Sequence, residues 1–298
     1  MNRQWQKQKA ERLLALHTRE TMLVLPNVWN AIGARVLEKK GYSAVATSSS
    51  AIAASLGYRD GEQIRKSTSL DIIARIAHSV DVPVSADVET GYGQTLPELE
   101  ESAKEFIDSG IAGINVEDSL IGLGRLRPVD EQCRRISAIR QAADRVGVHL
   151  VINARIDSYV SPEFGTREEA TDEAVMRARA YADAGADCIF PMGPGDEATV
   201  RQLRHRITCP LNIVVGPDAA PLPVLQEIGV NRVSFGPFIF RSCLRKFIQI
   251  ADTLKTTGDY ACFSDMLSKT DAGAYLLDGD ERQTVPEKTG IGLRRGRT

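Results

Sequence analysis

Three acidic side chains follow short apolar runs of the chain, where they could act together on a metal ion. Asp87 and Glu89 are two positions apart around the end of the run Val82–Val88, so on an extended strand both would point to one side. Glu117 ends the next run, Gly113–Glu117. Carboxylates gathered in one place repel one another unless a cation holds them, and oxygen ligands without nearby His or Cys prefer Mg²⁺ or Mn²⁺. We therefore expect a magnesium site formed by Asp87, Glu89 and Glu117.

Each of these acids, taken alone, also fits a helix cap or a surface ion pair. The metal is favoured because a basic residue, Arg155, lies at the end of the next apolar run and would face the acids. Further polar residues follow the second run, where Thr47, Ser48 and Ser49 lead into a loop that carries Asp60. These are the residues to which chemistry can be assigned if the ends of the runs meet in space.

The apolar runs themselves read as strands. They are mostly continuous in Val, Ile and Ala, as expected for parallel strands that are covered on their outer face. The eight candidates are Leu23–Val28, Ala44–Ser48, Val82–Val88, Gly113–Glu117, Leu150–Ile156, Cys188–Pro191, Leu211–Val215 and Arg232–Phe235.

The segments between the strands read as helices. Thr95 with Glu98, and Thr166 with Glu169, have the spacing of capping boxes. Eight strand–helix units without a second kind of domain predict a (β/α)8 TIM barrel of the α/β class, whose active site lies at the carboxyl ends of the strands. A doubly wound open sheet is the alternative, but it would need a glycine-rich phosphate loop, and no G-x-G-x-x-G is present.

The chain ends extend this barrel. Residues Met1–Glu20 predict a capping helix, and Phe238–Lys255 predicts a long helix after the last strand. A weaker helical pattern covers Asp265–Leu277. We expect one domain over residues 1–278 and a flexible tail over residues 279–298.

Composition excludes several classes of protein. A net charge of −2 among 298 residues gives no electrostatic case for binding nucleic acid or an anionic membrane. No apolar run approaches the ~20 residues of a spanning helix. The five cysteines form no C-x-x-C pair, which indicates reduced, buried thiols and a cytoplasmic location. The four histidines lie away from the strand ends, and G-x-S-x-G is absent.

Four stretches of the chain resemble the isocitrate lyase/phosphoenolpyruvate mutase superfamily, with motifs in the same order and spacing from about Leu23 to Phe247. The stretches are Thr47–Asp60, Asp87–Gly93, Val116–Asp118 and Asn153–Asp157. The resemblance implies a magnesium-dependent barrel that makes or breaks a C–C or P–C bond beside a 2-oxo or 2-hydroxy carboxylate through an enolate. It also implies a homotetramer that swaps the helix after the eighth strand.

The resemblance assigns roles by position. Asp87 would bind the metal directly, and Glu89 and Glu117 would hold metal-bound waters. Arg155 would pair with the substrate carboxylate. Asp60 would approach the reacting centre on a mobile loop.

For substrate binding, the resemblance points to Thr47, Ser48 and Ser49. The backbone N–H groups of Ser48 and Ser49 would receive a carboxylate or enolate oxygen.

One departure narrows the activity. Lyases of the superfamily carry a cysteine as general acid after the fourth strand, whereas this chain has Gly122–Arg127 without one, and Cys133 lies too far along. The pattern therefore resembles the phosphonomutase-like and oxaloacetate decarboxylase-like branch, which includes phosphonopyruvate hydrolase. The alternatives are a catalytically silent barrel that binds a 2-oxo acid and a 2-methylisocitrate lyase-type enzyme.

Overall fold

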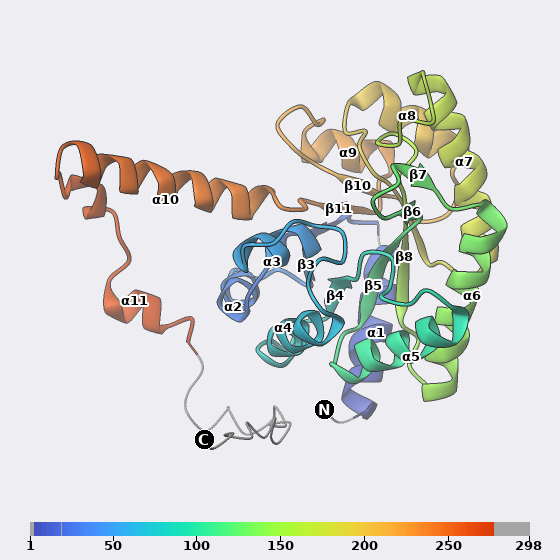
Figure 1. Ribbon diagram of the computed structural model, residues 1–298, viewed down its shortest axis with the longest axis horizontal. Coiled ribbons are helices and arrows are strands. Elements are labelled where there is room, and N and C mark those ends of the chain that lie inside the picture. The colour runs from blue at the N-terminus through green and yellow to red at the C-terminus, as the bar shows by residue number, and fades with distance from the viewer. Residues whose placement is uncertain (1–2, 19, 277–298) are drawn as a thin grey trace, which may run out of the picture.

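The computed structural model describes residues 3–18 and 20–276, which form a barrel of parallel strands surrounded by helices (Figure 1). Each predicted strand is present within two residues of its expected bounds. The barrel strands are β1 (Leu23–Leu25) with β2 (Asn27–Val28), β3 (Val45–Thr47), β4 (Val84–Asp87), β5 (Gly113–Glu117), β8 (Val151–Ile156), β9 (Cys188–Pro191), β10 (Asn212–Val214) and β11 (Arg232–Ser234).

The strand order confirms the barrel and shows that the doubly wound alternative is wrong. One sheet has the order β2-β3-β4-β5-β8-β9 and the other has β1-β11-β10, so the first and last strands of the chain are neighbours. The ladder is interrupted at Pro26, which separates β1 from β2 and has no N–H to donate. It is interrupted again between β9 and β10, where a single parallel bridge joins Ile189 to Leu211.

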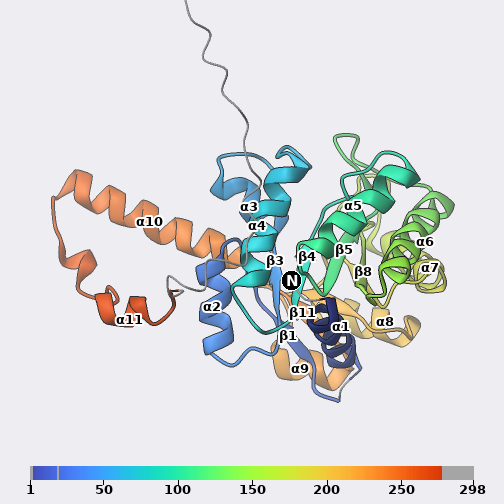
Figure 2. The ribbon, with the colours of Figure 1, turned by 90° about the horizontal axis from the view of Figure 1, so that it is seen from below.

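Helices cover the outer face of the barrel (Figure 2). The capping boxes expected at Thr95 and Thr166 are both formed. The helices are α1 (Arg3–His17), α2 (Ala31–Lys39), α3 (Ser49–Ser55), α4 (Lys66–His78), α5 (Leu96–Asp108), α6 (Val129–Val146), α7 (Arg167–Asp183), α8 (Glu197–Arg206), α9 (Leu222–Ile228), α10 (Phe238–Thr256) and α11 (Lys269–Gly273), with a 3₁₀ turn at Ala261–Phe263.

The first helix closes the end of the barrel where the strands begin. Leu13 of α1 is fully buried, and a Cβ added to Gly113 at the start of β5 would lie 2.8 Å from its side chain. The α1 residue Lys9 donates to the backbone oxygen of Val80 at 2.7 Å, just before β4. The expected capping helix is thus confirmed, and the opposite end of the barrel is left for the active site.

The structure departs from the sequence predictions in two places. A short antiparallel hairpin, β6 (Ser119–Leu120) with β7 (Arg125–Leu126), follows β5 and was not expected. The helix expected over Asp265–Leu277 is wrong in extent, because only α11 forms there. The long helix α10 is confirmed, but it stands away from the barrel and buries none of its residues (Figure 1).

The tail expected over residues 279–298 lies outside the described residues. Among those that are described, no helix combines the length and the apolar character needed to cross a membrane.

Candidate active site

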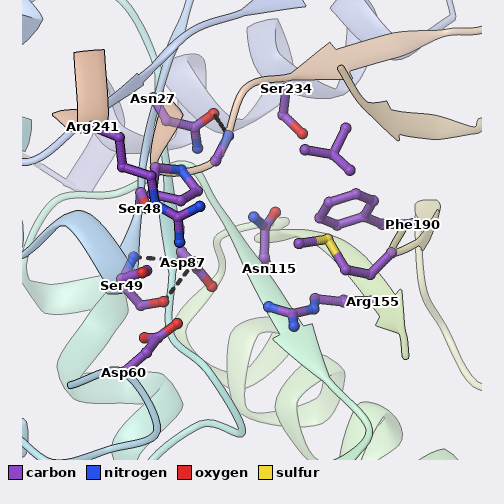
Figure 3. Close-up of a pocket in the computed structure, with 15 residues that line it drawn as sticks. Asn27, Ser48, Ser49, Asp60, Asp87, Asn115, Arg155, Phe190, Ser234 and Arg241 are labelled. Carbon is purple, nitrogen blue, oxygen red and sulfur yellow. Dashed lines mark hydrogen bonds between the residues drawn. The ribbon is translucent and has the colours of Figure 1, made fainter. Parts of the chain in front are cut away.

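A cavity of about 160 Å³ lies at the carboxyl ends of the strands (Figure 3). It is more than ten times the ~10–15 Å³ that one water molecule needs, so it has room for a small organic acid. The residues that line it are Asn27, Ser48, Ser49, Ser50, Asp60, Asp87, Asn115, Arg155, Phe190, Met192, Val214, Ser234, Gly236, Pro237 and Arg241. Barrel topology therefore brings together the ends of eight strand segments, as well as the loop that carries Asp60.

Asp87, at the last position of β4, presents its carboxylate to this cavity. Its Oδ2 accepts hydrogen bonds from the backbone N–H of Ser49 at 3.1 Å and from the Ser49 hydroxyl at 2.8 Å. Its backbone N–H donates to Thr47 Oγ1 at 2.9 Å, which fixes β3 against β4. Its Oδ1 accepts no hydrogen bond from the described residues, so this oxygen remains available to a ligand in the cavity.

Arg155 forms the opposite wall between two carboxylates. Its Nη1 lies 2.7 Å from Glu117 Oε2, as the β5–β8 register that pairs these residues allows. Its Nε and Nη2 donate to the two oxygens of Asp157 at 2.6 and 2.9 Å. Three of the five guanidinium N–H groups are thus used, and two remain for a substrate.

Two glutamates, Glu89 and Glu62, hold the loop that carries Asp60 over the strand ends. We call their hydrogen bonds the latch. Glu89 Oε2 accepts from the backbone N–H groups of Gly61, at 2.7 Å, and Glu62. Its Oε1 accepts from the Tyr92 hydroxyl at 3.0 Å. Glu62 in return accepts from Thr90 Oγ1 at 2.6 Å and from the backbone N–H of Tyr92 at 3.1 Å.

The direction of the Glu89 side chain differs from the one expected from the sequence. The strand β4 ends at Asp87, and Glu89 adopts a φ of 53°, so its side chain does not share the direction of Asp87. Glu62 and Tyr92 also have positive φ, at 53° and 54°, and non-glycine residues rarely adopt this conformation. All three lie in the latch, which indicates that the contacts between the two loops hold the backbone there.

Burial and mutual repulsion perturb the acids of the site. Burial, and next the charge of Asp87, raise the pKa of Asp60. Burial raises the pKa of Glu89 to about 7, even though the N–H of Glu62 opposes the change. Burial also raises the pKa of Glu117 well above its usual value, against the charge of Arg155. A cation bound among these acids would relieve the cost of their charges.

The donor set fits Mg²⁺ held by one direct protein ligand. Among the described residues no three His, Cys, Asp or Glu side chains converge closely enough to hold a metal together. Mg²⁺ commonly keeps several waters and uses one or two carboxylates. Asp87 offers a free oxygen in the cavity. By contrast, the two oxygens of Glu89 accept from the Asp60 loop and from Tyr92, and Glu117 pairs with Arg155. Magnesium binding itself stays a prediction.

The structure places the residues expected to bind substrate as follows. Ser48 and Ser49 line the cavity, but the N–H of Ser48 donates to Val28 O at 3.1 Å and that of Ser49 donates to Asp87. Thr47 is fully buried behind the cavity wall and does not line it. The predicted oxyanion contacts from Ser48 and Ser49 would therefore require these N–H groups to change partners.

Sequence reasoning missed several residues of the wall. Asn27, Asn115 and Ser234 are polar side chains near the carboxyl ends of predicted strands, which is a signal that could have found them. Arg241 comes from the first turn of α10. Its position follows from the turn after β11, which no local pattern predicts.

The cysteines lie away from the cavity. Cys133 on α6 donates its thiol to Ala180 O at 3.5 Å, between α6 and α7, so it does not reach the site. All five are free, but only Cys188 is buried and Cys243 is exposed. The expectation of buried thiols was wrong for Cys243 because α10 is not covered by the barrel.

The chain is similar to a known protein family and to individual proteins. The phosphoenolpyruvate phosphomutase family matches residues 13–255. A 2-methylisocitrate lyase of Bacillus subtilis (strain 168) is 30% identical over 213 residues, which cover 69% of this chain and 67% of that protein.

Solved structures that are similar to this chain point to the same family. A crystal structure from Burkholderia cenocepacia J2315, assigned as a phosphonomutase, has 37% identity and a TM-score of 0.78, and covers 82% of this chain and 99% of that one. Phosphoenolpyruvate phosphomutase from Streptomyces platensis subsp. rosaceus has 26% identity and a TM-score of 0.75, with coverage of 88% and 92%. Since the family match runs from α1 to the end of α10, this chain belongs to the phosphoenolpyruvate phosphomutase family of the isocitrate lyase superfamily, whose members are lyases and mutases.

Proposed function

We propose that the protein is a Mg²⁺-dependent enzyme that cleaves or rearranges a C–C or P–C bond next to a 2-oxo or 2-hydroxy carboxylate through an enolate. The observation that carries this proposal is the cavity itself, where the free carboxylate oxygen of Asp87 and the protonatable Asp60 share the space with Arg155. Oxaloacetate decarboxylation, phosphonopyruvate hydrolysis and a phosphonomutase reaction are the activities that we favour.

The chain's own residues can bind and orient such a substrate. Arg155 is fixed by Glu117 and Asp157, so its two remaining N–H groups are oriented in advance for a carboxylate. Burial and the charge of Asp87 raise the pKa of Asp60, which favours the protonated form of a general acid beside the reacting carbon. The hydrogen bonds of Glu89 and Glu62 hold the Asp60 loop over the strand ends.

Asp87 would hold the metal, with Glu89 and Glu117 near it as predicted partners of its waters. When bound, Mg²⁺ supplies Lewis-acid polarisation of the 2-oxo group.

The loop after β5 favours a leaving group that needs no thiol acid. Residues Gly122–Arg127 contain no cysteine, and Cys133 is held between two outer helices. Carbon dioxide departs without protonation, so metal and hydrogen-bond donors can supply most of the barrier lowering, with one donor worth about 3 kcal/mol. A C–C lyase reaction would need another proton source.

A substrate panel tests the proposal. Oxaloacetate, phosphonopyruvate, isocitrate and 2-methylisocitrate are each incubated with the protein, with Mg²⁺ or EDTA, and pyruvate, glyoxylate and succinate are measured against a protein-free metal control. We expect pyruvate from oxaloacetate or phosphonopyruvate only with Mg²⁺. Turnover of isocitrate that iodoacetamide abolishes would contradict the assignment.

The second candidate is a 2-methylisocitrate lyase-type enzyme, which the name of the Bacillus subtilis relative favours. Pyruvate and succinate from 2-methylisocitrate in the same panel would select it. The third is a barrel that binds a 2-oxo acid without turnover, which the panel would indicate if no product formed from any acid.

We also propose that the protein forms a homotetramer through α10. The helix carries the exposed apolar residues Leu244, Phe247 and Ile248, at 44%, 68% and 42% exposure, and the barrel leaves them uncovered. A surface of this kind is typical of subunit contact. We further expect a cytoplasmic enzyme that binds neither nucleic acid nor membranes.

A further inference from the structure

A fully buried arginine lies inside the barrel, below the cavity. Arg232 on β11 is 0% exposed, and Ser234, two residues further along the same strand, lines the cavity. Because side chains two positions apart on a strand point to one side, Arg232 also points into the barrel, one layer deeper. Burial lowers the pKa of Arg232 to about 10, so its guanidinium still carries a positive charge at neutral pH.

No carboxylate of the described residues lies within ion-pair distance of Arg232, and its Nε has no hydrogen-bond partner among them. Its side chain makes two contacts. Nη2 donates to Asn115 Oδ1 at 3.0 Å, and Nη1 lies 3.5 Å from His17 Nε2. An apolar side chain in the place of a buried charge is often neutral or stabilising. The stability of the core therefore gives no reason for a charge at this position.

Arg232 fixes the direction of the Asn115 side-chain amide. A guanidinium can only donate hydrogen bonds, so the amide oxygen Oδ1 must face Arg232. Asn153 Nδ2 donates to the same oxygen at 2.8 Å. The Nδ2 end of Asn115 therefore points the other way, toward the cavity that this residue lines (Figure 3). It donates to no group in the part of the chain that the structure describes, and it is accessible from the cavity.

This free amide stands beside the candidate metal ligand. In the β4–β5 register Asn115 is paired with Asp87, whose Oδ1 is also free. Neighbouring strands lie about 4.8 Å apart, so one oxygen atom of a ligand can contact both a metal ion on Asp87 and the amide of Asn115. Negative charge that develops on such an oxygen meets a donor that Arg232 has already oriented.

We propose that Asn115 is a catalytic residue that donates a hydrogen bond from Nδ2 to the oxygen on which negative charge develops, and that Arg232 is its positioning residue. This oxygen is the 2-oxo or enolate oxygen of the proposed function, on which the inference rests. The hydrogen bond from Arg232 holds the amide in one orientation, and its charge polarises the amide N–H groups toward the cavity. Asn115 thus supplies a donor that the N–H groups of Ser48 and Ser49, already engaged, do not.

Binding of oxalate tests both roles without turnover. Oxalate is a planar dianion that resembles an enolate beside a carboxylate. Its dissociation constant is measured by calorimetry with Mg²⁺ on the wild type, Asn115→Leu, Arg232→Met and the double variant. Asn115→Leu leaves the buried guanidinium of Arg232 without its acceptor and costs stability, whereas the double variant removes both partners and reports the loss of the amide in a folded chain.

The matched control is Arg204→Met. Arg204 on α8 also donates to an asparagine oxygen, Asn231 Oδ1 at 3.0 Å, but it does not line the cavity. Thermal unfolding by circular dichroism is measured on every variant.

We expect Asn115→Leu and the double variant to weaken oxalate binding to the same extent, about tenfold or more, because each lacks a hydrogen bond to a charged oxygen. Arg232→Met alone should weaken it about threefold or more, and it should melt no lower than Arg204→Met. Once the amide is gone, the loss of Arg232 should have no further effect on oxalate. Arg204→Met should bind oxalate as the wild type does.

Wild-type affinity for oxalate in Asn115→Leu and in the double variant would overturn the role of Asn115. An equal loss from Arg232→Met with and without Asn115 would mean that the charge acts on the ligand directly, and would refute the positioning role. Failure of the proposed function looks different. Oxalate binding that depends on both residues, together with no turnover of any acid in the substrate panel, would support the contact with Asn115 and contradict the enzyme.

Discussion

Asn27 provides a sharp test of how the barrel closes beside the active site. Its side chain is 3% exposed and makes three hydrogen bonds to backbone groups. Two come from Phe235 and Gly236 after β11, and the third runs from Asn27 Nδ2 to Thr47 O on β3 at 2.8 Å. The substitution Asn27→Ala removes all three and leaves two N–H groups and one carbonyl without their partner.

The size of the effect follows from these three contacts. An orphaned buried polar group costs about 1–3 kcal/mol, and the lower end applies here because the cavity lets water reach the groups. Summed over the three groups, the expected loss in the free energy of unfolding is about 3 kcal/mol. For a chain of this size, 1 kcal/mol shifts the melting temperature by about 2–4 °C, so Asn27→Ala should melt roughly 6–12 °C lower.

A matched asparagine nearby serves as control. Asn30 caps α2 through one hydrogen bond, from the N–H of Gly33 at 2.9 Å, and loss of such a cap costs about 1 kcal/mol. Thermal and urea unfolding of Asn27→Ala, Asn30→Ala and the wild type are followed by circular dichroism. The reasoning is refuted if Asn27→Ala is no less stable than Asn30→Ala.

Other perturbations test the core, the metal site, the assembly and the thiols. Burial lowers the pKa of His17 from 6.5 to about 4, so between these pH values the unfolded chain binds a proton at this residue and the folded chain does not. About 3 kcal/mol of the free energy of unfolding should therefore be lost as the pH falls from 6.5 to 4. In urea titrations, His17→Gln should show a stability that depends less on pH. Asp87→Asn should abolish Mg²⁺-dependent turnover with unchanged circular dichroism, and full activity with EDTA harmless would contradict the metal site. Leu244→Asp with Phe247→Asp should convert a tetramer to smaller species by light scattering, whereas a wild type that is already monomeric at micromolar concentration would contradict the assembly. Iodoacetamide should leave pyruvate formation largely intact, and its loss would implicate a thiol.

The sequence could predict the fold because the signals for it are local. Each strand is a short apolar run, and several helices have a side-chain cap and an apolar stripe within one segment, as Thr95 with Glu98 illustrates. Eight strand–helix units can pack together in only a few folds. The C-terminal segment shows the limit of this reasoning. The helical pattern over Asp265–Leu277 gave only the short helix α11, none of whose residues is buried, and a short helix without buried residues is marginal.

The candidate site was predicted in part. Asp60, Asp87, Arg155, Ser48 and Ser49 line one cavity, because the carboxyl ends of parallel strands meet at one end of a barrel. The sequence by itself determined that these five residues reach this end.

Only the tertiary structure decided which atoms there are free to bind. Glu89 turns its carboxylate to the Asp60 loop because β4 ends two residues earlier, and the N–H groups of Ser48 and Ser49 are already engaged. Arg241 enters the cavity because Asn27, 208 residues from Phe235, fixes the turn before α10. Hydrogen bonds between segments so distant in the chain leave no local pattern, so the direction of a side chain and the partners it has already taken become known only when the barrel is closed.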